Sequence, residues 1–438
     1  MTKKFTVTDL RKGAVFPNTE YRFSRLKETH DGVVLERDFL GENPLHYYSD
    51  IRFGDLIVAN NIIDIKEYLE QQWTFTWERV RAVSNNNRTS IDDLAFVSAS
   101  PKEEESDLTL QEYELSPSID YTNIADIGRR VRGLLLDSLD LRLSTIDDPE
   151  VGLLLSGGLD SMGVGYLLSQ ITNRKITAFT LKVDENDLDV VKSRELAKRF
   201  NIDLSEVKVD LDQSGLSIIL QRYGPDRKLR YIKKIAEGLP LDDVILESLK
   251  ISGNPKKDNL FCAAAMYLIG RAIVSEGIKT VFCGEGPNEM INDYGFNPCD
   301  SGYATEDKGD ICFREALTFG FKKTDRQLGR GGLPKHAVAR MGKIFAHYGI
   351  RLEAPYFNRD IARIMTLVPH ITRYDTIKQH LVGAMFNGEG LDAFIQGTSK
   401  EKFQDGSGVS RLFHDFDQKR LIGMFEGVYG IKKAGYLK

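Results

Sequence analysis

The residues best suited to chemistry form one short string, Ser156-Gly157-Gly158-Leu159-Asp160-Ser161, directly after the apolar run Val151–Leu155. Apolar spacing typical of a helix then continues from Leu159 to Leu168. Glycine lets the backbone approach a ligand closely, and the free N–H groups at the start of a helix attract anions. Serine hydroxyls donate hydrogen bonds, and a carboxylate is a ligand for Mg²⁺. The string therefore predicts a loop that holds pyrophosphate together with Mg²⁺. The alternative is that Gly157-Gly158 only turns the chain and that Asp160 only caps a helix.

Apolar runs and helical patterns alternate around this string. We expect strands over 151–155, 175–183, 204–209 and 279–283, and helices over 124–143, 187–200 and 261–277. Such alternation predicts an α/β fold with a doubly wound parallel sheet, covered on both faces. Ligands bind beyond the carboxyl ends of the strands in these sheets. After about residue 303 we expect helices.

The first part of the chain has a different character. Short β-like runs occur at Gly32–Leu35, Asp55–Ala59 and Trp73–Val80. The polar stretch Ser84–Ser116 is typical of an exposed loop or linker. We therefore expect a smaller β-rich domain over 1–118 and the α/β domain over 119–438.

Bulk properties exclude several classes of protein. The net charge is −5 among 438 residues, which gives no global attraction to nucleic acid. A basic cluster is expected to be a solvated helix face rather than an RNA contact: Arg227, Lys228, Arg230, Lys233 and Lys234. No apolar run is long enough to span a bilayer, and the N-terminus does not resemble a signal peptide. The four cysteines show no Cys-x-x-Cys spacing. We expect a cytoplasmic protein with buried thiols, with no membrane partner and with homodimer formation left open.

The string at 156–161 resembles the pyrophosphate loop of the ATP-pyrophosphatase superfamily, whose members cleave ATP to AMP and pyrophosphate. Three further strings are similar to class B asparagine synthetases, and Gly406-Ser407-Gly408 within one of them resembles the related β-lactam synthetases. They are Thr280–Glu289, which contains Gly284-Glu285-Gly286; Gly349–Asp360, which contains Ala-Pro-Tyr-Phe-Asn; and Ser399–Gly408, which contains Lys400-Glu401-Lys402-Phe403. The resemblance covers roughly 123–415. It implies ATP and Mg²⁺ as cofactors, and a small-molecule carboxylate with ammonia or an amine as substrates.

The resemblance also implies a role for individual residues. Glu285 would be the base that takes a proton from the attacking nitrogen, and Lys400 would stabilise developing negative charge. Asp160 and Asn288 would hold Mg²⁺, although the family has an aspartate where this chain has Asn288. The ATP and pyrophosphate contacts would come from Leu155, Ser156, Gly157, Gly158, Asp160, Ser161, Leu181 and Gly284.

The N-terminal part matches the same family more weakly. Arg37–Tyr47 resembles a segment of its glutaminase domain, but it lies early in the chain, and Thr2 stands where a cysteine nucleophile would be expected. This suggests a truncated, degenerate glutaminase-like domain of the type with an N-terminal nucleophile. We expect an AMP-forming carbon–nitrogen ligase that makes an acyl-adenylate and does not use a glutaminase of its own. Intramolecular ring closure, as in β-lactam synthetases, another superfamily member such as a tRNA modifier, and a catalytically silent scaffold remain alternatives.

Overall fold

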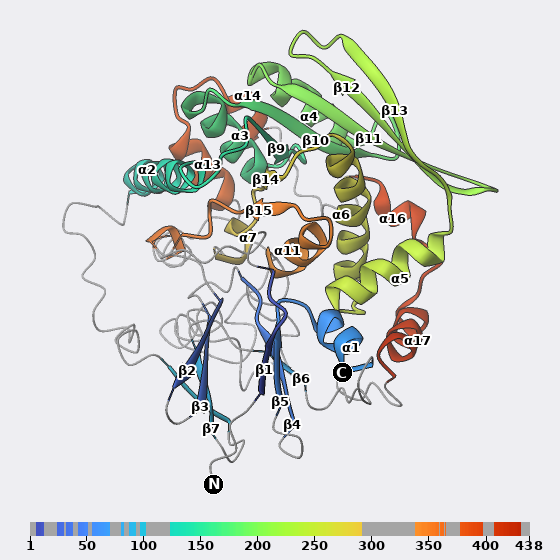
Figure 1. Cartoon of the computed structure of the whole chain (residues 1–438). Coiled ribbons are helices and arrows are strands. Elements are labelled where there is room, and N and C mark those ends of the chain that lie inside the picture. The colour runs from blue at the N-terminus through green and yellow to red at the C-terminus, as the bar shows by residue number, and fades with distance from the viewer. Residues whose placement is uncertain are drawn as a thin grey trace, which may run out of the picture.

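The computed structural model describes residues 6–12, 24–29, 32–37, 43–50, 55–70, 80–82, 87–92, 97–101, 123–290, 338–358, 360–362, 364, 377–396 and 407–430. Figure 1 shows two parts, a β-rich N-terminal part and a larger part that combines one sheet with many helices.

The N-terminal part is a β-sandwich with one helix on its outer face. One sheet has the order β1-β5-β4-β6 and the other the order β2-β3-β7-β8. Apolar side chains from both sheets meet between them, including Leu35 of β3, Tyr47 of β4 and Leu56 of β5. The neighbouring residues Tyr48 and Ile57 point to the opposite face and pack against α1, because successive side chains of a strand alternate. The elements are β1 Thr6–Asp9, β2 Ser24–Thr29, β3 Gly32–Arg37, β4 His46–Asp50, β5 Asp55–Ala59, α1 Ile62–Glu70, β6 Val80–Ala82, β7 Asn87–Asp92 and β8 Val97–Pro101.

The expectation of a loop or linker over Ser84–Ser116 is wrong for part of that stretch. β7 pairs antiparallel with β3, and β8 pairs antiparallel with β7. Polar composition is compatible with a strand because the backbone, not the side chains, makes the hydrogen bonds of the sheet. The short runs at Gly32–Leu35 and Asp55–Ala59 are strands, as expected.

The larger part is built on a sheet of seven strands in the order β13-β12-β11-β10-β9-β14-β15. The strands β11, β10, β9, β14 and β15, which are neighbours in this order, run parallel to one another. This confirms the α/β class and the expected strands, with modest differences in their ends. The strands are β9 Glu150–Leu154, β10 Lys175–Lys182, β11 Asp203–Asp212, β12 Gly215–Tyr223, β13 Leu229–Leu239, β14 Thr280–Phe282 and β15 Arg351–Glu353.

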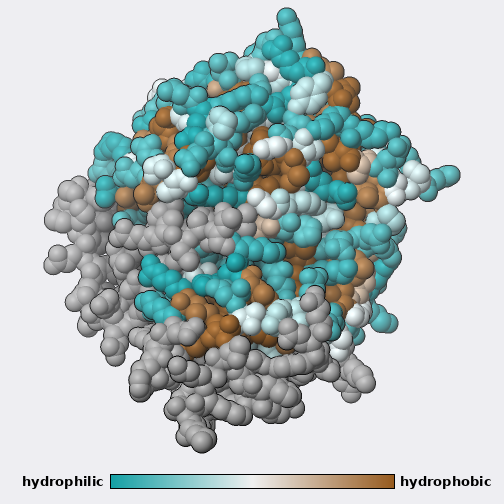
Figure 2. All heavy atoms as spheres, in the orientation of Figure 1, coloured by the Kyte–Doolittle hydropathy of each residue, from teal (hydrophilic) through white to brown (hydrophobic). Residues whose placement is uncertain are grey.

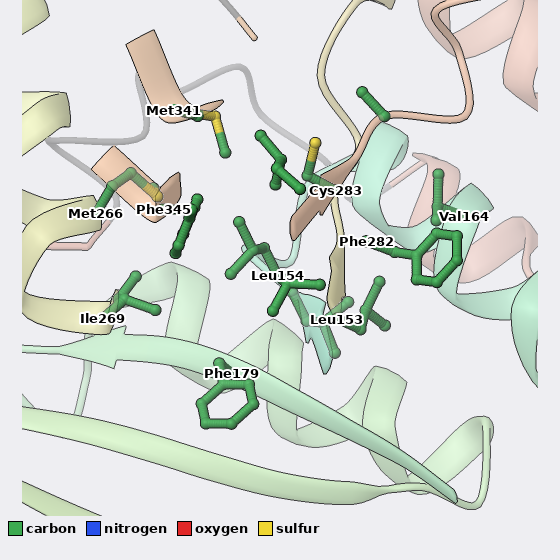
Figure 3. Close-up of a cluster of buried hydrophobic side chains, with 14 of the residues drawn as sticks. Leu153, Leu154, Val164, Phe179, Met266, Ile269, Phe282, Cys283, Met341 and Phe345 are labelled. Carbon is green, nitrogen blue, oxygen red and sulfur yellow. The ribbon is translucent and has the colours of Figure 1, made fainter. Parts of the chain in front are cut away.

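Helices cover both faces of this sheet (Figures 1 and 3). On one face α3 packs so closely that a Cβ at Gly165 would lie 2.8 Å from Leu153 and 3.0 Å from Phe200, the residue that ends α4. On the other face α6 contacts β10 to β13 and α11. The helices are α2 Ile124–Leu143, α3 Leu159–Ile171, α4 Leu188–Arg199, α5 Leu241–Ser252, α6 Lys257–Ser275, α7 Pro287–Met290, α11 Val338–His347, α13 Ile377–Met385, α14 Asp392–Gln396, α16 Val409–Leu412 and α17 Gln418–Tyr429.

The basic cluster at 227–234 corrects another expectation. Four of its residues lie on or beside β13, the edge strand of an antiparallel hairpin with β12, and not on a helix. Leu216, Ile218 and Leu220 of β12 alternate into the core, whereas Tyr231 and Ile232 of β13 are exposed. An edge strand tolerates consecutive lysines because both of its faces reach water, and such charges discourage pairing with other chains.

Figure 3 shows the core at the centre of the sheet, where Leu153 and Leu154 of β9 lie between Phe179 of β10 and Phe282 of β14. On the face shown in Figure 2, hydrophilic residues predominate and apolar residues form separate small areas. Within the described part of the chain, no helix is long and apolar enough to cross a membrane. Of the four cysteines, Cys283 is buried and Cys262 partly buried, and both are free thiols.

Candidate active site

The loop between β9 and α3 has the geometry of an anion site. Gly157 adopts a φ of +71°, and a Cβ there would lie 2.6 Å from Cβ of Lys192, so both conformation and space favour glycine. The serines at either end of the loop lie face to face, with 3.2 Å between Oγ of Ser156 and Oγ of Ser161. Gly158 begins α3 without any side-chain cap. The first N–H groups of a helix of 13 residues are therefore available to an anion, with the positive end of the helix dipole behind them.

The end of β14 closes directly onto this loop. A Cβ at Gly284 would lie 2.4 Å from the backbone nitrogen of Ser161 and 2.6 Å from the carbonyl carbon of Asp160. β9 and β14 are neighbours in the sheet, and the chain runs from β9 to β10 on one side and returns to β14 on the other. The direction of winding reverses between them, which is where α/β sheets form a ligand crevice. The loop and Gly284 thus face one another at the switch point.

Three polar side chains from three elements meet at this crevice. Asp160 lies in the first turn of α3, Asn288 lies in α7, and Lys378 lies in α13. Nζ of Lys378 donates to Oδ2 of Asp160 and, at 2.6 Å, to Oδ1 of Asn288. Both Lys378 and Asp160 are largely buried.

These contacts bear on the expected Mg²⁺ site. Mg²⁺ takes six oxygens at about 2.0–2.1 Å, usually from one or two carboxylates together with waters and substrate phosphates, and this pair offers one carboxylate and one amide oxygen. Here the oxygens of both side chains already accept hydrogen bonds from an ammonium group. No cluster of three or more acidic, histidine or cysteine side chains lies elsewhere among the described residues. In this arrangement Asp160 and Asn288 do not fit a metal ion held between them, and the predicted role of the pair remains for binding measurements to test.

Glu285 follows Gly284 in the same crevice. Partial burial raises the pKa of its carboxyl group, and the negative charge of Asp160 raises the pKa further. The positive charges of Arg340 and Lys378 act in the opposite direction and lower that pKa. The net pKa shift is upward, which is the direction that makes a carboxylate a better proton acceptor. Its role as a base stays a prediction.

A buried ion pair holds the segment that carries the Ala-Pro-Tyr-Phe-Asn string. Nη1 of Arg142 in α2 donates to Oε2 of Glu353 at 2.6 Å, and its Nη2 donates to the carbonyl oxygen of Phe357 at 2.9 Å. The side chains of the pair are 1% and 0% exposed. Phe357 in turn packs beneath Gly286, where a Cβ would lie 3.0 Å from its ring. The pair therefore fixes one wall of the crevice from 211 residues away in the sequence.

Two of the expected nucleotide contacts occupy neighbouring strands. Leu155 directly follows β9 and Leu181 lies next to the end of β10, and both are buried. The carbonyl oxygen of Leu155 accepts a hydrogen bond of 2.7 Å from Ser193 in α4. Together with Gly284 they mark the carboxyl ends of three adjacent strands, as the sequence predicts. That they contact a nucleotide stays a prediction.

Lys400 lies outside the described residues, so its expected role is not tested. The next helix within the described residues is α16. Arg411 of α16 donates to Oδ1 of Asp187 at 2.5 Å, and the other oxygen of Asp187 accepts from the backbone nitrogens of Val183 and Asp184. Helix α16 is thereby tied to the loop that follows β10.

No motif in the sequence marks Lys378, Arg340 or Arg142 as site residues. Each lies outside the strings that drew attention, and each reaches the crevice through tertiary packing. Lys378 lies in the first turn of α13, which packs closely against α2: a Cβ at Gly128 would lie 2.5 Å from Cβ of Ala384. No local pattern marks such a residue.

Part of the chain matches a known protein family. Residues 130–216 match a family model described as asparagine synthase. The matched segment runs from α2 into β12 and contains the loop at 156–161, but it ends before Gly284 and Glu285. A search of curated proteins found no match. Over about a fifth of its length, which includes the candidate anion loop, the chain is thus similar to the asparagine synthase family, and this supports an ATP-dependent ligase.

Proposed function

We propose that this protein is an ATP-dependent, AMP-forming carbon–nitrogen ligase that couples a small carboxylic acid to ammonia or an amine. The single observation that carries the proposal is the crevice at the switch point. There the uncapped start of α3 follows the end of β9. Glu285, whose carboxyl group has a raised pKa, follows the end of the neighbouring strand β14, close to the start of α3. The match of residues 130–216 to the asparagine synthase family agrees with ATP as the substrate.

In the first step the substrate carboxylate attacks the α-phosphorus of ATP, which forms an acyl-adenylate and breaks the bond to the β-phosphate. The leaving pyrophosphate is held by the N–H groups at the start of α3 and by the hydroxyl groups of Ser156 and Ser161. Donors fixed in place before the reaction stabilise the charge that develops on the leaving group. The backbone N–H groups of the loop are already in place, whereas the hydroxyl groups of Ser156 and Ser161 form hydrogen bonds within the loop and rotate toward the phosphates when these bind.

In the second step the nitrogen nucleophile attacks the acyl carbon and AMP leaves. Glu285 accepts the proton that the nitrogen loses as the tetrahedral intermediate forms. Its placement one residue after Gly284 puts it at the end of β14, beside the loop that holds the phosphates. The pyrophosphate leaving group thus lies on the α3 side of the crevice, and the nitrogen nucleophile lies on the β14 side.

The test is product analysis. We would incubate the protein with ATP and a panel of carboxylic acids, each with ammonium or an amine, and separate nucleotides by chromatography. AMP and pyrophosphate should accumulate with at least one acid, and Asp160→Ala should abolish them, whereas Lys419→Ala on the exposed face of α17 serves as the control. ADP and phosphate as products would contradict the proposal. Absence of ATP cleavage throughout the panel would favour the silent scaffold.

A further inference from the structure

Lys378 occupies the position that lies between the two expected metal ligands. Its ammonium group contacts Oδ2 of Asp160 and lies 2.6 Å from Oδ1 of Asn288. The three residues come from three helices, and the lysine is 15% exposed. The ammonium group is therefore held from both sides and is largely shielded from water.

The charges of Asp160 and Asn288 match the ammonium group of Lys378, so the pair does not require a metal ion for charge balance. Asp160 contributes one negative charge, Asn288 contributes none, and Lys378 contributes one positive charge, so the three are balanced without a metal. A second carboxylate at position 288 would leave an excess negative charge that Mg²⁺ could neutralise. With the amide, a Mg²⁺ ion in contact with the same oxygens would lie beside the ammonium group and be repelled.

The described charged groups around Glu285 have the same balance. Glu285 and Asp160 are the acidic groups whose charges act on one another, and Arg340 and Lys378 are the basic groups that act on Glu285. An ammonium group has three protons to donate, and two acceptors for Lys378 are found among the described residues. The third proton is available to an oxygen of a bound phosphate group.

We propose that Lys378 replaces a metal ion between Asp160 and Asn288, so that the protein binds the phosphates of ATP without a Mg²⁺ ion bridging this pair. The inference rests on the proposed function, since it assigns the pyrophosphate of ATP to this crevice. It explains why an amide at position 288 is compatible with a working site: the amide orients the ammonium group and leaves its charge for the ligand.

The test measures binding rather than turnover. We would titrate the protein with α,β-methylene-ATP, which resists cleavage at the reacting bond, by calorimetry in EDTA and in excess Mg²⁺. The variants are Lys378→Met, Asn288→Asp and Lys378→Met with Asn288→Asp, and Lys419→Met is the matched control. Circular dichroism verifies that each variant is folded. Electron paramagnetic resonance of Mn²⁺ without nucleotide detects any metal held by the pair itself.

For the unaltered protein and for Lys419→Met, we expect the Kd for the nucleotide analogue in EDTA to lie within about threefold of the Kd in Mg²⁺. Removal of Mg²⁺ should thus cost less than about 1.4 kcal/mol of binding free energy, which corresponds to a tenfold change in Kd. Lys378→Met should weaken binding in EDTA by about 10–150-fold, the range for a hydrogen bond to a charged group. The double variant should regain binding in Mg²⁺ and bind Mn²⁺, because it presents two carboxylates and no ammonium group.

Two results would overturn the inference in different ways. If the unaltered protein binds the analogue only in Mg²⁺, and binds Mn²⁺ through Asp160 and Asn288, then a metal displaces the lysine and the inference is wrong while the proposed function stands. If the analogue does not bind in either condition, the crevice is not an ATP site and both proposals fail.

Discussion

Replacement of Gly284 by alanine should separate α3 from β14 and disable the candidate crevice. The added Cβ would lie 2.4 Å from the nitrogen of Ser161, 2.6 Å from the carbonyl carbon of Asp160 and 2.8 Å from Cα of Ser161. All three atoms belong to the backbone, so no change of side-chain rotamer relieves the contact. To reach an ordinary distance of 3.4 Å, the start of α3 must retreat by about 1 Å.

The size of the effect follows from this displacement. Overpacking of a tight contact costs about 1–3 kcal/mol of unfolding free energy. A shift of about 1 Å in a reacting group can lower a rate by about 10²-fold. The start of α3 carries both the anion loop and Asp160, so release of pyrophosphate should fall by about that factor while the protein stays folded.

The assay is pyrophosphate release beside urea denaturation followed by circular dichroism. Gly423→Ala is the matched control, because Gly423 lies in α17 with nothing within 4 Å of its added Cβ. That variant should gain up to about 1 kcal/mol from the higher helix propensity of alanine and keep its activity. A Gly284→Ala protein with unaltered stability and a rate within twofold of normal would show that the close contact between β14 and α3 is not needed, and the reasoning would fail.

Three further predictions concern the crevice and its supports. Glu285→Gln should leave pyrophosphate release intact and slow amide formation by about 10²–10⁴-fold in single-turnover assays. The pKa of Glu285 is raised above the ordinary 4.5, so the rate of amide formation should begin to fall, as the pH is lowered, at a pH above 4.5. This fall should be absent in Glu285→Gln. Equal loss of pyrophosphate release and amide formation in the variant would contradict the role of Glu285 as the base. Arg142→Met should lower the unfolding free energy by about 1.5–3 kcal/mol, because Glu353 loses the charged hydrogen bond from Nη1 of Arg142 but keeps its ion pair with Arg351; an unchanged unfolding free energy would refute this account. Tyr356→Phe should leave stability unchanged or raise it, because the buried hydroxyl has no hydrogen-bond partner among the described residues; a large loss in a melting experiment would reveal a partner.

The sequence predicts this fold best where local pattern and tertiary role agree. The apolar run before Ser156 and the helix after it are confirmed because a buried parallel strand needs a continuous apolar run. The same logic places Gly284 at the end of β14. The strands at 87–92 and 97–101 were missed because polar sandwich strands resemble loops in composition, and β13 was missed because an exposed edge strand has no apolar face.

The candidate site was predictable only in part. The glycines and serines of the loop are recognised from a contiguous string, because their function depends on neighbours in sequence. Lys378 and Arg142 depend on packing between helices that are distant along the chain, and no spacing rule connects Lys378 to Asp160 across 218 residues. The substitution at Asn288 was seen from the sequence, but the ammonium group that accompanies it emerges only from the structure.

The most direct test of the central claim is an isotope transfer experiment. An acid that supports ATP cleavage is prepared with ¹⁸O in its carboxylate and allowed to react to completion, and the AMP is examined by mass spectrometry. An acyl-adenylate requires one carboxylate oxygen to leave with AMP, so AMP should carry one ¹⁸O atom and pyrophosphate none. Unlabelled AMP, or ¹⁸O in inorganic phosphate released with ADP, would contradict the account.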